Sequence, residues 1–95
     1  MAENKIAVEY IDNTSLLTYA VNLARDNSSP VATFVNSATV TDTPNNASMG
    51  CGLIFVRYNA RFILFFPNLL DSIYYNKYDN DTKWSGWKRI SLQDA

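Results

Sequence analysis

Apolar positions recur at a helical spacing in the N-terminal third of this 95-residue chain. They lie three or four residues apart, at Leu16, Leu17, Ala20, Val21 and Ala24. This is the spacing of one face of an α-helix. Asn13 or Thr14 can cap the first turn, and "DNSSP" follows with turn formers and a proline. The pattern predicts one amphipathic helix over residues 14 to 26.

From residue 31 onward the pattern changes to short runs of β-branched and aromatic residues. The runs are "VATFVNS", "CGLIFVRY", "RFILFFP", "IYYNKY" and "WKRISL", and this composition is typical of strands. Asn59 and Ala60 alone separate the second run from the third. A two-residue turn there predicts a hairpin with Tyr58 opposite Arg61. By the same register Val56 lies opposite Ile63.

Both alternating faces of this predicted hairpin are apolar, so we expect it to be central and covered on both sides. The helix would cover one side, and a second sheet or a partner chain would cover the other. The expected fold is α+β and mainly β, with one N-terminal amphipathic helix packed on an antiparallel sheet of about five strands. A meander and a small sandwich both fit this description.

The chain length fits a single domain spanning residues 1 to 95. Residues 1 to 12 include "KIAVEYI", which alternates like a strand. We expect this segment to be a weakly ordered lead-in to the helix at 14 to 26. The β region then occupies residues 31 to 92.

Composition argues against several classes of partner. A net charge of −1 gives no reason to expect nucleic acid or an anionic membrane. The longest apolar runs are far shorter than the roughly 20 residues that span a bilayer, and the N-terminus does not resemble a signal peptide. We therefore expect neither nucleic-acid binding nor membrane insertion.

Catalytic and metal-binding residue types are scarce. The chain has no histidine and a single cysteine, Cys51, which removes the usual general base, an internal disulfide and Cys-based metal sites. Cys51 begins an apolar run and is expected to be a small buried side chain. The segment "DNDTK" at 79 to 83 begins like a calcium loop but lacks the glycine and glutamate that complete one. Asp71, Asp79 and Asp81 lie in turn-like contexts. We predict no catalytic residue, no metal and no cofactor.

Aromatic residues in the C-terminal half are the remaining candidates for a site. Flat rings beside polar groups are what a sugar-binding surface uses, since the rings stack and the polar groups donate or accept hydrogen bonds. The predicted glycan contacts are Trp84, Tyr78, Tyr74, Asp81 and Arg57. The same rings also suit ordinary packing at a sheet edge.

The pair of tryptophans in "WSGW" allows two arrangements. If Ser85 and Gly86 form a tight turn, Trp84 and Trp87 face each other across it. If a loop spans residues 79 to 86, Trp87 enters the core and Trp84 lies free at the tip. The sequence does not choose between them.

The order of segments resembles a known kind of domain. The "TDTPNN" loop, the "GLIFVRYN", "RFILFFPN" and "SIYYNKY" strands and the final "WSGWKRI" look like the C-terminal knob-type domains of bacteriophage tail fibres and pyocin fibres. The resemblance covers roughly residues 31 to 92, and residues 84 to 90 are its most specific part. It does not include the helix.

This resemblance implies a location in the virion, at a fibre tip or on the virion surface. It also implies a non-enzymatic homotrimer that binds bacterial surface polysaccharide for host attachment. The alternative that it implies is a structural assembly or decoration domain, which contacts other virion proteins and has no small-molecule ligand.

Overall fold

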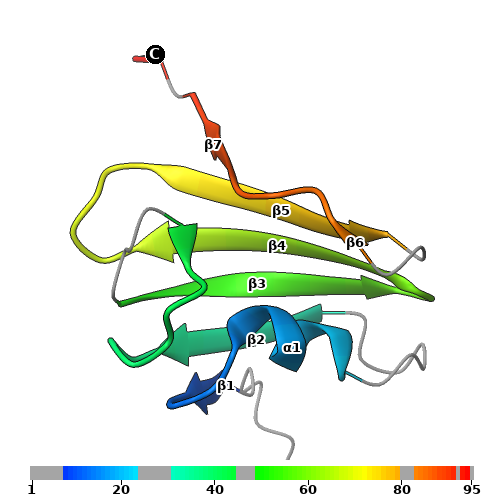
Figure 1. Ribbon diagram of the computed structural model, residues 1–95. Coiled ribbons are helices and arrows are strands. Elements are labelled where there is room, and N and C mark those ends of the chain that lie inside the picture. Colours follow the sequence, from blue (N-terminus) through cyan, green and yellow to red (C-terminus); the bar gives the residue numbers. More distant parts are fainter. Residues whose placement is uncertain (1–7, 24–30, 45–48, 80–82, 92, 95) are drawn as a thin grey trace, which may run out of the picture.

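The protein forms one mixed β-sheet with a short helix on one side (Figure 1). The computed structural model describes residues 8–23, 31–44, 49–79, 83–91 and 93–94. Its elements are β1 (Val8–Ile11), α1 (Leu16–Val21), β2 (Val31–Asn36), β3 (Gly50–Arg57), β4 (Ala60–Pro67), β5 (Ile73–Asp79), β6 (Lys83–Trp84) and β7 (Lys88–Ile90).

The strands lie in the order β1-β2-β3-β4-β5-β6, and β7 also pairs with β5. β1 and β2 are parallel, with α1 in the connection between them, and all other pairs are antiparallel. The mainly β character is therefore confirmed. The sheet has more strands than the five expected, and part of the segment assigned to the lead-in forms the parallel strand β1.

The helix is shorter than predicted. α1 has six residues, its N-cap is Ser15 rather than Asn13 or Thr14, and Asn22 ends it. The Ser15 hydroxyl accepts a hydrogen bond from the Thr18 amide at 3.0 Å, which is the usual N-cap interaction. Asn13 instead has a φ of 52°, so its backbone cannot be the extended cap. Residues 24 to 26 of the predicted helix lie outside the described part.

The β3–β4 hairpin also differs from the prediction in its turn. Arg57 pairs with Ala60 and Val56 with Arg61, so Tyr58 and Asn59 form the turn, with Tyr58 at a φ of 51°. The pairing has moved by two residues relative to the predicted register. Because strand side chains alternate with a period of two, each residue still lies on the expected face.

The core lies between the sheet and α1. Its buried apolar residues are Ile11, Leu16, Ala20, Phe34, Val40, Ile54, Val56, Ile63, Phe65 and Tyr74. Phe34 and Phe65 stack with ring centroids 6.3 Å apart. Gly52 makes room for this stack, since a Cβ there would lie 2.7 Å from the Phe34 ring and 2.2 Å from the Leu64 carbonyl oxygen. The core thus depends on a glycine in a central strand.

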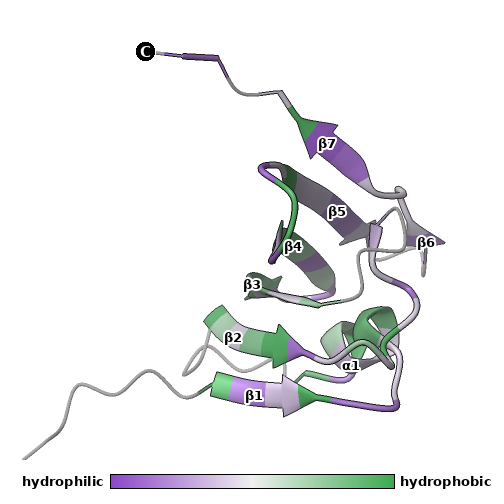
Figure 2. Ribbon diagram, turned by 90° about the vertical axis from the view of Figure 1, so that its left-hand side faces the viewer, coloured by the Kyte–Doolittle hydropathy of each residue, from purple (hydrophilic) through white to green (hydrophobic). Residues whose placement is uncertain are grey.

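The other side of the sheet is apolar and exposed, and we call it the open face. Its most exposed apolar residues are Val8, Tyr10, Val31, Val35, Phe55 and Ile90. Figure 2 shows α1 on one side of the strands, and no described helix or strand lies over the opposite side. Within the described residues no second sheet covers this side of the hairpin, and cover by a partner chain stays a prediction. Cys51, expected to be buried, is exposed because the alternation turns Gly50 and Gly52 toward the core.

Candidate functional site

The C-terminal edge of the sheet contains a β-bulge at "SGW". Tyr78 pairs with Trp84 on one side of it, and Tyr75 pairs with Lys88 on the other. Three residues, 85 to 87, therefore oppose the two residues 76 and 77. One extra residue in one strand defines a bulge. Neither a tight turn at Ser85 and Gly86 nor a loop through residue 86 describes this arrangement.

The Asn76 side chain holds the bulge in place. It is 1% exposed, and its Oδ1 accepts hydrogen bonds from the Lys77 amide at 2.9 Å and the Gly86 amide at 3.0 Å. The Ser85 amide donates to the Lys77 carbonyl at 2.8 Å. Gly86 takes a φ of 97°, which glycine adopts without steric cost. A buried polar side chain and a glycine thus fix the edge strand.

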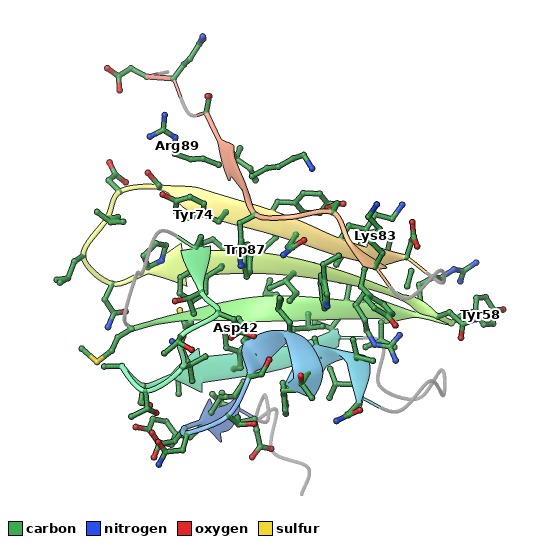
Figure 3. The ribbon with its side chains drawn as sticks, viewed as in Figure 1. Asp42, Tyr58, Tyr74, Lys83, Trp87 and Arg89 are labelled. Carbon is green, nitrogen blue, oxygen red and sulfur yellow. The ribbon has the colours of Figure 1, made fainter. Side chains whose placement is uncertain are left out.

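The bulge places both tryptophans on the side of the sheet that packs against α1. A one-residue shift in register exchanges the two faces of a strand, so residues three apart come to lie on the same side. Both side chains are half-buried and pack against the core. The Trp87 ring lies 6.0 Å from the Phe65 ring, and its Nε1 donates to the Asp42 carbonyl oxygen at 3.0 Å (Figure 3). Trp87 is a structural anchor.

Asp42 connects this anchor to the start of α1. Its carboxylate accepts hydrogen bonds from the Leu16 amide at 2.9 Å, the Leu17 amide at 3.1 Å and the Ser15 hydroxyl. The first amides of a helix have no partner within it, and a carboxylate there is favourable. The C-terminal edge strand, the 37–44 loop and the helix therefore form one connected unit.

Arg61 occupies the corresponding place at the other end of α1. Its side chain is 1% exposed and donates to the Ala20 and Leu23 carbonyls, each at 2.8 Å. It also donates to the Tyr58 carbonyl at 2.8 Å and the Ala60 carbonyl at 2.9 Å. A guanidinium carries five donors in a fixed planar fork. Arg61 therefore ties the end of the helix to the hairpin turn, which explains why the turn lies at 58 and 59.

A third polar cluster lies beyond the end of β1. The Asp12 carboxylate accepts hydrogen bonds from the hydroxyls of Ser37 and Thr39. These hydrogen bonds favour the ionised form and lower the pKa of Asp12 from its ordinary value of 3.8. The cluster fastens the segment after β1 to the loop after β2.

Of the predicted glycan contacts, the structure brings Tyr78 and Trp84 together. Tyr78 and Trp84 lie side by side, with ring centroids 5.2 Å apart and planes tilted by 51°. Tyr74 is 4% exposed and belongs to the core, so its ring is not a surface contact. Arg57 lies on the open face, with its guanidinium 4.9 Å from the Tyr58 ring centroid. Asp81 lies outside the described residues.

The residues that the sequence did not single out are Arg61, Asn76 and Asp42. The sequence did indicate that Arg61 is unusual, because it alternates onto the same strand face as the apolar Ile63 and Phe65 in "RFILFFP". A charged residue at a core position of a strand needs several hydrogen-bond partners. Nothing in the sequence marks Asn76 or Asp42 in this way, since Asn76 accepts from the Gly86 amide of the next segment and Asp42 accepts from the Leu16 and Leu17 amides of the helix.

The described residues contain no group of three acidic, cysteine or histidine side chains placed to hold a metal ion. No helix among them is long and apolar enough to cross a bilayer. No family model, no curated protein and no solved structure matches the chain.

Proposed function

We propose that this chain is a non-enzymatic structural module of a bacteriophage fibre or virion surface, and that it acts by assembling with other protein chains as a homotrimer. The observation that carries the proposal is the open face. A sheet that is apolar on both sides and has a helix on only one of them, within the described residues, needs further protein on the other. The phage assignment rests on the resemblance of residues 31 to 92.

The arrangement of "WSGWKRI" supports a structural role for its tryptophans. Trp87 packs on Phe65 and binds Asp42, and the bulge orients both tryptophans toward the core. A motif that packs in this way stabilises the domain and requires no ligand.

Binding of bacterial surface glycan is the second candidate function. It is favoured by the Tyr78–Trp84 pair, in which two half-buried rings lie together at the outer edge of the sheet. Adjacent aromatic rings with polar tips suit a sugar that stacks on one ring and accepts hydrogen bonds. Trimerisation would strengthen a weak site of this kind through avidity.

Two measurements on the isolated domain test these functions. Light scattering at micromolar concentration should give the mass of a trimer, and a stable monomer would contradict the assembly proposal. Binding to host cells and to a glycan array should then be compared for the wild type, Trp84→Ala and a control, Tyr58→Asn. The control removes a different exposed ring, in the β3–β4 turn, and asparagine tolerates the positive φ at that position.

Each outcome selects one function. A folded trimer that binds no glycan and no host cell supports the structural role alone. Binding that is lost in Trp84→Ala and kept in Tyr58→Asn supports glycan recognition. Binding that survives the Trp84 substitution would remove the Tyr78–Trp84 pair from consideration.

A further inference from the structure

We draw no further inference here: the strongest candidate, the apolar open face of the sheet on the side away from α1, carries nothing beyond the proposed function, because nothing among the described residues shows what covers it.

Discussion

Replacing Arg61 by methionine should lower the free energy of unfolding by about 3 kcal/mol. The side chain is 1% exposed and donates to four carbonyls at 2.8–2.9 Å, those of Ala20, Leu23, Tyr58 and Ala60. Hydrogen bonds from a charged donor each contribute about 1.5–3 kcal/mol. Most of that sum is offset by the cost of burying the guanidinium, which is several kcal/mol. Methionine retains much of the stem volume, so the carbonyls that lose their donor dominate the effect.

The free energy of unfolding is measured by urea titration, with circular dichroism and tryptophan fluorescence as two probes and the protein concentration held constant. Arg61→Lys should fall between the wild type and Arg61→Met, because one ammonium keeps the charge but does not span the helix end and the hairpin turn. Arg89→Met is the matched control. Arg89 is exposed on β7 and does not lie on the open face, since it pairs with the core residue Tyr74, and its substitution should change stability by less than about 0.5 kcal/mol.

A loss below about 1 kcal/mol in Arg61→Met would refute this role of Arg61, because one ordinary hydrogen bond contributes that much. An equal loss in Arg89→Met would refute it as well. If Arg61→Met does not fold, the Lys variant still tests the argument, since full stability in Arg61→Lys would show that the planar fork is not needed.

Three further predictions concern stability. Gly52→Ala should lower the melting temperature more than Gly86→Ala, because the Cβ at position 52 would lie 2.2 Å from a β4 carbonyl oxygen. A Cβ at position 86 meets no atom and costs only the strain of its positive φ, about 1–2 kcal/mol. Equal losses in the two variants would contradict this. In urea, Asp42→Ala should lose about 1–2 kcal/mol of helix capping, and no loss would show that the cap is redundant. The lowered pKa of Asp12 means that its contribution is present above about pH 4 and is lost as the pH falls through the folded pKa. The urea midpoints of the wild type and Asp12→Asn should therefore differ near neutral pH and converge in strong acid, and a constant difference would exclude this titration.

The alternation of apolar residues predicted the faces of the sheet better than its register. Ile54, Val56, Ile63 and Phe65 lie together on the core side, as the pattern indicates. The alternation determines which face each side chain lies on but not which residue it pairs with. A register shift of two residues leaves every side chain on the same face. The position of the turn depends on Arg61, whose five carbonyl partners come from the helix end and the hairpin. A contact between distant segments of this kind leaves no local pattern.

The helix and the first strand show a different limit of sequence reasoning. The three-to-four spacing predicted helical structure near Leu16 and Ala20, and both residues are buried in α1. Its start depends on Asp42, which lies 26 residues after Leu16 and accepts from the Leu16 amide. β1 is short and at the edge, and its parallel pairing with β2 depends on the crossover through α1. Local propensity contains neither of these tertiary contributions.

The bulge in the last strand explains why the sequence indicated the residues of the candidate site but not their arrangement in space. In an unbroken strand, residues three apart point to opposite faces, so Trp84 and Trp87 would be separated by the sheet. One extra residue, held by Asn76 and by the positive φ of Gly86, returns both rings to the core side. Trp87 then packs against the core, and Trp84 lies beside Tyr78 at the margin of the sheet. The two tryptophans that share a motif therefore have different surroundings, and a ligand at this edge would meet Trp84 first.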